Sequence, residues 1–167
     1  VPQGVEGIVP YAGTVERVGA RVRGFKPGDE VAGMALWSLR SHVLAEPSVM
    51  WRKPAHLSFE QAASLPTVFL TAHYALEHLA RLQPGEKILI HGAAGGVGQA
   101  AIQVARRLGI EVLATAGSPE KRKMLSDMGV EHVMSSRTLE FADQVMEFTD
   151  GRGVDAVAER VDHRGAR

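Results

Sequence analysis

One stretch near the middle of the chain, residues 89–98, limits the folds that this sequence can form more than any other. It reads LIHGAAGGVG, a short apolar run followed by a glycine-rich segment. In the residues that follow, 99–108, small and apolar side chains recur at helical spacing: Ala101, Val104, Ala105 and Leu108. The pattern predicts a strand, a tight turn and a helix in direct succession.

The glycines of this turn predict an anion site. Gly95 and Gly96 allow the backbone to turn sharply and to approach a ligand, and Gly98 allows the helix to lie against the preceding strand. The start of a helix offers free backbone N–H groups and the positive end of the helix dipole, which together suit the pyrophosphate of a dinucleotide. We therefore expect the cofactor contacts to come from Ala93, Ala94, Gly95, Gly96, Val97 and Gly98.

The match to the dinucleotide fingerprint G-x-G-x-x-G is incomplete, because Ala93 occupies the first glycine position. Such a pattern carries little weight alone, and its context supports it. A strand precedes it, an amphipathic helix follows, and a second apolar strand is expected at residues 111–116, as a βαβ unit requires. The alternative is a glycine-rich turn in an α/β protein that binds no nucleotide.

The end of the second strand predicts the choice of cofactor. An NAD-binding domain places an acid there to accept hydrogen bonds from the ribose, whereas residues 114–118 of this chain read ATAGS. Ser118 at a helix start, with Lys121 and Arg122 in the next turn, offers a hydroxyl and two cations to a 2′-phosphate. This favours NADPH. The alternative is that Ser118 only caps the helix and the two cations only form its solvated face.

The residues before the glycine turn predict a small β-rich unit and two helices. Strands are expected at 14–18 and 30–32, with a Pro-Gly turn at 27–28 between them. Ser58 and Gln61 form a capping box for a short helix at 59–65, which Pro66 is expected to interrupt before a second helix at about 71–80. The boundary between the two units is expected between residues 54 and 71.

Beyond the second strand the alternation of helices and strands continues. We expect a helix from Pro119 to Gly129, a strand at 132–134, a helix marked by Phe141, Val145 and Phe148, and a fourth strand at 154–157. Residues 159–167 are charged and aperiodic. The sequence therefore predicts an α/β fold, a partial doubly wound parallel sheet of the Rossmann type that follows a β-rich unit.

Composition excludes several classes of function. Lys plus Arg equals Asp plus Glu at 19 each, so no global field favours nucleic acid or acidic membrane surfaces. There are 0 cysteines, which excludes disulfides and thiolate metal sites. No apolar run reaches the length of a membrane span, and a cytoplasmic protein is expected.

Seven segments carry a resemblance to the medium-chain dehydrogenase/reductase superfamily, and especially to the enoyl reductase domain of polyketide synthases. These segments are residues 13–19 (GTVERVG), 27–31 (PGDEV), 57–76, 82–86 (LQPGE), 91–103 (HGAAGGVGQAAIQ), 116–122 (AGSPEKR) and 151–155 (GRGVD). The resemblance implies the C-terminal part of a GroES-like unit at 1–60, a partial NADPH-binding Rossmann domain at 61–158 and an aberrant charged tail at 159–167.

The resemblance also implies an activity. NADPH would reduce the α,β double bond of an enoyl thioester held on an acyl carrier protein, within a larger multidomain synthase. No metal takes part in this family, in agreement with the lack of cysteine and with scattered histidines that read as surface or packing residues: His42, His56, His73 and His78. Thr71 would lie near the nicotinamide end of the cofactor, and Tyr74 would either join it or serve in packing.

The sequence also departs from the family in ways that leave the catalytic residues unassigned. Glu159, Arg160 and Val161 stand where the family has Asn-Ser-Leu, and Tyr11 does not occupy the motif position of a proton-donating tyrosine. A zinc-free quinone oxidoreductase, or a non-catalytic truncated chain, therefore stays open as an alternative. The chain of 167 residues is expected to be marginally stable and inactive on its own.

Overall fold

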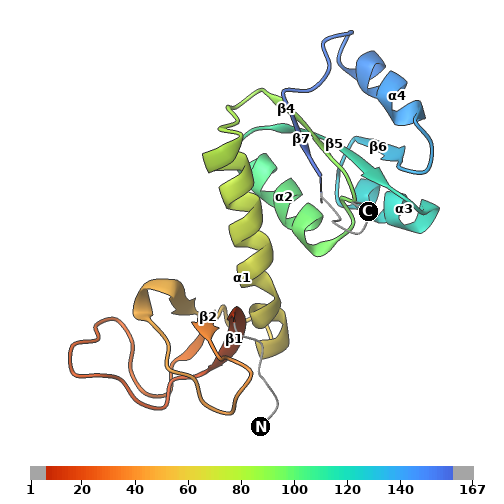
Figure 1. Cartoon of the computed structure of the whole chain (residues 1–167). Coiled ribbons are helices and arrows are strands. Elements are labelled where there is room, and N and C mark those ends of the chain that lie inside the picture. The colour runs from red at the N-terminus through yellow and green to blue at the C-terminus, as the bar shows by residue number, and fades with distance from the viewer. Residues whose placement is uncertain (1–6, 160–167) are drawn as a thin grey trace, which may run out of the picture. The chain divides into compact units, whose positions relative to one another are not determined.

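The computed structural model describes residues 7–159, which form two compact units that divide between Val68 and Phe69. Figure 1 shows these residues coloured from red on the N-terminal side to blue on the C-terminal side. The expected tail lies outside the described residues apart from Glu159. No helix within the described part of the chain is both long and apolar enough to cross a membrane.

The first unit is a 3-stranded antiparallel sheet in the order β1-β2-β3. Its strands are β1 (Ile8–Thr14), β2 (Glu30–Leu36) and β3 (Met50–Arg52), and a short 3₁₀ helix, η1 (Pro47–Val49), precedes the third. The central strand β2 supplies the buried side chains of Val31, Ala32 and Ala35. A β-rich unit before the glycine turn is therefore confirmed.

The prediction of a strand at 14–18 is wrong, because the strand lies earlier, at Ile8–Thr14. It pairs with β2 along its whole length, from Ile8 opposite Leu36 to Thr14 opposite Glu30. The sheet tolerates Pro10 in this strand because β1 lies at an edge. Two backbone hydrogen bonds of Val15 follow the last strand pair. Val15 N–H donates to the Asp29 carbonyl oxygen, and the Val15 carbonyl oxygen accepts from Gly28 N–H, both at 2.9 Å.

A single long helix replaces the two that the sequence predicted. The capping box is confirmed, since Ser58 N–H donates to Gln61 Oε1 at 2.9 Å and Gln61 N–H donates to Ser58 Oγ at 3.2 Å. Helix α1 (Phe59–His73) then continues through Pro66 and passes directly into the wider turns of η2 (Tyr74–Leu79). Proline removes one N–H from the helical ladder, and the surrounding turns tolerate this loss around the buried Pro66.

The second unit contains a 4-stranded parallel sheet in the order β6-β5-β4-β7. Its strands are β4 (Lys87–Ile90), β5 (Glu111–Ala116), β6 (His132–Ser135) and β7 (Ala156–Ala158). The predicted strand at 111–116 is confirmed at both ends, and the fourth strand starts two residues later than expected. This is the order 3-2-1-4 of the first four strands of a Rossmann sheet.

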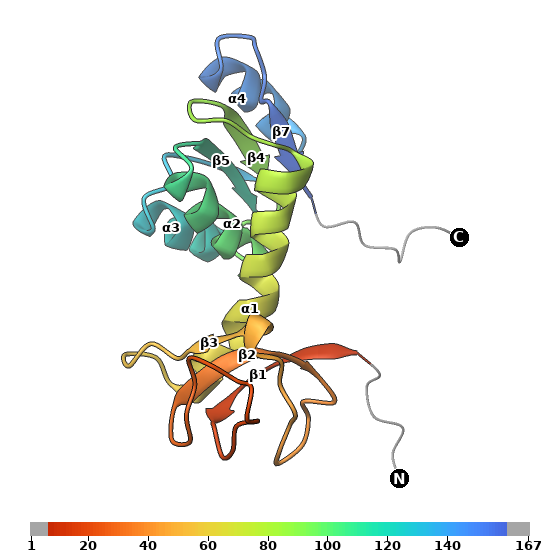
Figure 2. The ribbon, with the colours of Figure 1, turned by 90° about the vertical axis from the view of Figure 1, so that its left-hand side faces the viewer.

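Helices cover both faces of this sheet, as a parallel sheet requires. Figures 1 and 2 show α2 (Gly96–Arg107) and α3 (Pro119–Asp127) on one face and α4 (Glu140–Phe148) on the other. Under α4, a core cluster joins Leu89, Leu113 and Met134 of three strands to Val145. Helix α2 faces the sheet with small buried residues, including Ala101 and Ala105, which permit a close approach.

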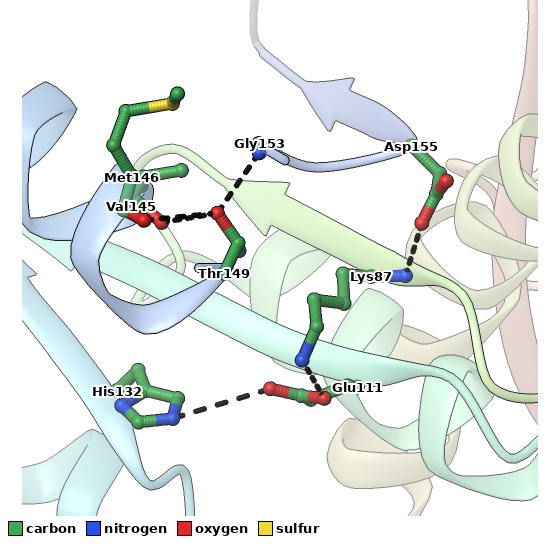
Figure 3. A network of polar contacts seen from close by, with 8 residues as sticks. All are labelled: Lys87, Glu111, His132, Val145, Met146, Thr149, Gly153 and Asp155. Carbon is green, nitrogen blue, oxygen red and sulfur yellow. Dashed lines mark hydrogen bonds and ion pairs between the residues drawn. The ribbon is translucent and has the colours of Figure 1, made fainter. Parts of the chain in front are cut away.

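Polar contacts join all four strands near their amino ends (Figure 3). Lys87 Nζ pairs with the Glu111 carboxylate, and His132 Nε2 lies 4.0 Å from Glu111 Oε1. Lys87 N–H donates to Asp155 Oδ2 at 2.8 Å, which ties β4 to the approach to β7. Thr149 Oγ donates to the Val145 carbonyl oxygen at 2.7 Å and accepts from Gly153 N–H at 2.9 Å, closing the loop after α4. These contacts at the amino ends of the strands stabilise the fold. The candidate site lies at the carboxyl ends of the strands.

Candidate dinucleotide site

The glycine turn lies at the carboxyl end of the inner strand β4, between β5 and β7. In sequence, β5 and β6 extend the sheet to one side of β4, whereas β7 pairs on its other side. The order of strands thus reverses at β4. In open α/β sheets, ligands bind outside the carboxyl ends of the strands at this point of reversal.

Hydrogen bonds from the neighbouring strands fix the turn. Ala93 N–H donates to the Thr115 carbonyl oxygen of β5 at 3.1 Å, and His91 N–H donates to the Ala158 oxygen of β7 at 2.9 Å. The side chains add to this, because His91 Nδ1 lies 2.9 Å from Thr115 Oγ1 and the His91 ring meets Phe141 edge-on at 5.1 Å. Sequence reasoning assigned no role to His91 or Thr115, since their pairing depends on strand register.

The start of α2 presents backbone groups without side-chain cover. Gly95 is the N-cap, and Gln99 N–H donates to its oxygen at 2.9 Å. The N–H groups of Gly96, Val97 and Gly98 precede this first helical bond, and the first N–H groups of an α-helix have no intrahelical partner. Residues 95–97 are exposed. The turn therefore offers an accessible set of donors that suits an anion.

Gly98 shows how closely the helix approaches the turn. A Cβ at this position would lie 2.6 Å from both the Cα and the carbonyl oxygen of Ala93, which are backbone atoms that cannot move aside. Ala93 itself is fully buried and Ala94 partly so. The fingerprint's last glycine is thus required for packing against the turn, and the exposed part of the fingerprint is limited to residues 95–97.

The end of β5 carries the residues expected to choose the cofactor. Ser118 caps α3, with its Oγ accepting from Lys121 N–H at 3.3 Å, and Arg122 Nη1 donates to the Ala116 carbonyl oxygen at 3.3 Å. The Ser118 hydroxyl also donates to the Glu120 carboxylate, and this bond, with the backbone N–H of Glu120, holds the pKa of that carboxyl below its ordinary value.

A residue that sequence reasoning did not assign to the site, Arg137, also lies at this strand end. A Cβ built on Gly117 would be 3.0 Å from Arg137 Nε and 3.2 Å from its Nη2. The guanidinium thus lies directly over Gly117, just beyond the end of β5. The sequence shows a glycine after β5 and a basic residue after β6. Only the pairing of β5 with β6 shows that these two residues are neighbours.

Thr71 and Tyr74 belong to the helix that leads into the Rossmann sheet. Thr71 is exposed near the end of α1, and its contact with a cofactor stays a prediction. Tyr74 is 54% exposed and stacks on the His78 ring at 5.7 Å. Glu77 joins this helix to α2 through an ion pair with Arg107 of 2.6 Å.

The histidines that the sequence analysis read as surface or packing residues include two that pair with nearby carboxylates. His42 pairs with Glu16 at 3.1 Å and His73 with Glu77 at 2.6 Å. Within residues 7–159, no group of three or more His, Asp or Glu side chains is placed to hold a metal ion.

Comparison with known proteins relates the chain to dehydrogenases and to polyketide synthases. Residues 96–165 match the family described as zinc-binding dehydrogenase. The chain is 45% identical over 154 residues to the phthioceranic/hydroxyphthioceranic acid synthase of Mycobacterium tuberculosis, covering 90% of this chain and 7% of the synthase. It superposes on the crystal structure of CurK enoyl reductase with a TM-score of 0.84 and 47% identity, covering 92% of this chain and 46% of CurK.

The chain is homologous to the enoyl reductase domains of polyketide synthases. Two other solved structures are less similar to this chain than CurK enoyl reductase is. A quinone oxidoreductase of Pseudomonas syringae is 38% identical with a TM-score of 0.76, covering 93% of this chain and 49% of that protein. A mycobacterial protein in complex with NADPH is 35% identical with a TM-score of 0.76, covering 89% of this chain and 47% of that protein. The chain spans about half the length of these structures.

Proposed function

We propose that this chain forms the cofactor-binding part of an NADPH-dependent enoyl reductase within a multidomain, cytoplasmic synthase. Its substrate would be an enoyl thioester carried on an acyl carrier protein, reduced at the α,β double bond. The observation that carries the proposal is the pairing of an exposed glycine turn at the point of strand reversal with a cluster of cations at the end of β5. The similarity to enoyl reductases along 92% of the chain supports the choice of reaction.

The residues present fit a dinucleotide. The N–H groups of Gly96, Val97 and Gly98 would bind the pyrophosphate, because they open a helix whose N-cap carries no side chain. A Cβ on Gly95 would lie 3.3 Å from the Gly92 oxygen and would project from the turn where the ligand must approach. When bound, the nicotinamide supplies a hydride for the β-carbon of the enoyl group.

The end of β5 favours NADPH over NADH. Ala116 ends the strand and Gly117 follows it, so no carboxylate stands directly after the strand to accept hydrogen bonds from a ribose. Lys121 is exposed on the first turn of α3, and Arg122 is held at the strand end by its bond to Ala116. Ser118 would contribute mainly by capping α3, whose N-terminus follows the end of β5. The NADPH complex of a mycobacterial relative is consistent with this choice.

A substitution of Lys121 tests the cofactor assignment. Lys121→Ala should weaken NADPH binding by about 1.5 kcal/mol, or about tenfold, and leave NADH nearly unchanged, because only NADPH carries the 2′-phosphate. Lys123→Ala is the matched control, since Lys123 lies on the same helix and pairs with Asp127 at 2.9 Å. Calorimetric titration measures both affinities. Equal losses for the two cofactors would contradict the assignment and indicate a structural role for Lys121.

An activity assay separates the proposed reaction from that of a quinone oxidoreductase. The complete protein that contains this chain should oxidise NADPH with a crotonyl thioester and not with a quinone. The reverse preference would overturn the proposed substrate class while leaving the cofactor assignment intact.

A further inference from the structure

The segment after β6 holds a cation beside the end of β5. Ser136 N–H donates to the Ala116 carbonyl oxygen at 3.2 Å, and Arg137 N–H donates to Ser135 Oγ at 3.2 Å. These two bonds fix the backbone at the point where Arg137 leaves the sheet. Its guanidinium consequently lies over Gly117, within 3.0 to 3.3 Å of the place where a side chain would begin.

The guanidinium of Arg137 has no acidic partner among residues 7–159. The nearest acids in sequence have other contacts. Glu140 accepts from Thr138 Oγ1 at 3.1 Å, and Glu120 accepts from Ser118. By contrast, Arg107 and Arg52 both form ion pairs, with Glu77 and Asp29. Arg137 is thus an exposed cation that is positioned by its backbone and available to an anion.

We propose that Arg137 binds the 2′-phosphate of the adenosine and is a principal determinant of the preference for NADPH. This inference rests on the proposed function, because it places the adenosine ribose at the end of β5. A guanidinium can donate two parallel hydrogen bonds to a phosphate, which a lysine ammonium cannot match in geometry. Gly117 favours this arrangement, since a Cβ there would lie 3.0 to 3.3 Å from the guanidinium and would push it aside by a few tenths of an ångström.

Two small ligands isolate this contact from the rest of the cofactor. Adenosine 2′,5′-bisphosphate carries the 2′-phosphate, and 5′-AMP lacks it. With the full chain, calorimetric titration should show that Arg137→Ala weakens binding of the bisphosphate by about tenfold and leaves 5′-AMP unchanged. Arg137→Lys should recover part of the loss. Arg152→Ala is the matched control, because Arg152 is an exposed arginine that precedes β7, at the opposite edge of the sheet.

The outcomes distinguish this inference from the proposed function. If the wild-type chain prefers the bisphosphate and Arg137→Ala retains that preference, the role of Arg137 is wrong and the cofactor assignment stands. If the wild-type chain binds both ligands equally or neither, the NADPH proposal fails and the role of Arg137 fails with it. Circular dichroism checks that each variant is folded, and Arg137→Gln replaces Arg137→Ala if the shorter side chain prevents folding.

Discussion

Gly98 is the residue at which the start of α2 touches the glycine turn. Gly98→Ala should lower the free energy of unfolding by about 1–3 kcal/mol, because its Cβ would lie 2.6 Å from backbone atoms of Ala93 and the turn would have to shift. Gly13→Ala is the control, since a Cβ there meets no atom within 4 Å. Urea unfolding measures both. Equal stability of the two variants would show that the turn can yield at no cost.

Thr115 supports the same turn from the inner side of the sheet. Its side chain is fully buried, and its Oγ1 lies 2.9 Å from His91 Nδ1. Thr115→Val keeps the volume but leaves the partly buried imidazole nitrogen without this partner, so it should cost about 1–3 kcal/mol of stability. Thr115→Ser keeps the hydroxyl and is the control. Thermal unfolding of the two variants decides, and a valine variant more stable than the serine variant would contradict the role of this bond.

Which site residues the sequence can predict depends on how local their interactions are. The cap of α3 by Ser118 involves Lys121, three residues away, and was predictable from the Ser-Pro pattern. The contact of Arg137 with Gly117 needs the third strand beside the second, and no local pattern contains that information. The contact of Ser118 with a cofactor stays a prediction, since only its cap of α3 is visible in the structure.

At the scale of one element, Ser58, which precedes α1, and Ser64 within it have opposite roles. Ser58 accepts from Gln61 N–H as the cap, whereas Ser64 Oγ donates to the Gln61 carbonyl oxygen within the helix at 2.7 Å. Ser58→Ala should lower the free energy of unfolding by about 1 kcal/mol, and Ser64→Ala should be neutral or slightly stabilising. Urea unfolding of both variants tests this. Equal effects would mean that the cap contributes nothing beyond helix propensity.

The elements of the second unit followed from the sequence better than those of the first. Strand 111–116 is a short apolar run between a glycine and a Gly-Ser-Pro segment, so its ends are marked locally. The ends of β1 depend on pairing with β2, and the alternation at 14–18 was not a guide to that pairing. Pro66 also misled the prediction, because a proline breaks a helix only where the surrounding turns fail to compensate for the missing N–H.

At the scale of the whole molecule, the lowered pKa of Asp29 predicts how the free energy of unfolding depends on pH. Arg52 Nη1 lies 2.8 Å from its Oδ1 and Lys26 N–H donates to its Oδ2 at 2.9 Å, and these contacts, led by that of Arg52, hold the pKa of Asp29 below its ordinary value of 3.8. The unfolded chain therefore binds a proton at a higher pH than the folded chain. The stabilisation is complete above the ordinary pKa and is lost as the pH falls through the folded value.

The corresponding variant is Asp29→Asn. It should be less stable than the wild type at pH 7, and the difference between the two should shrink as the pH is lowered below about 4. Urea midpoints at several pH values measure this difference. Asp143→Asn, an exposed position on α4, is the control. A difference that stays constant down to pH 3 would show that the carboxylate charge of Asp29 is not the source of the stabilisation.

The pairing of β4 with strands from distant parts of the chain has a consequence for the order of folding. The contact of Lys87 with Glu111 closes a loop of 24 residues, whereas the contact of Lys87 with Asp155 closes one of 68. Longer loops cost more entropy to close, so the β4-α2-β5 segment should assemble before β7 joins it. The bond from His91 to Ala158 belongs to that late step. The glycine turn thus acquires its final support last, and a nucleotide that binds it would select chains whose sheet is already complete.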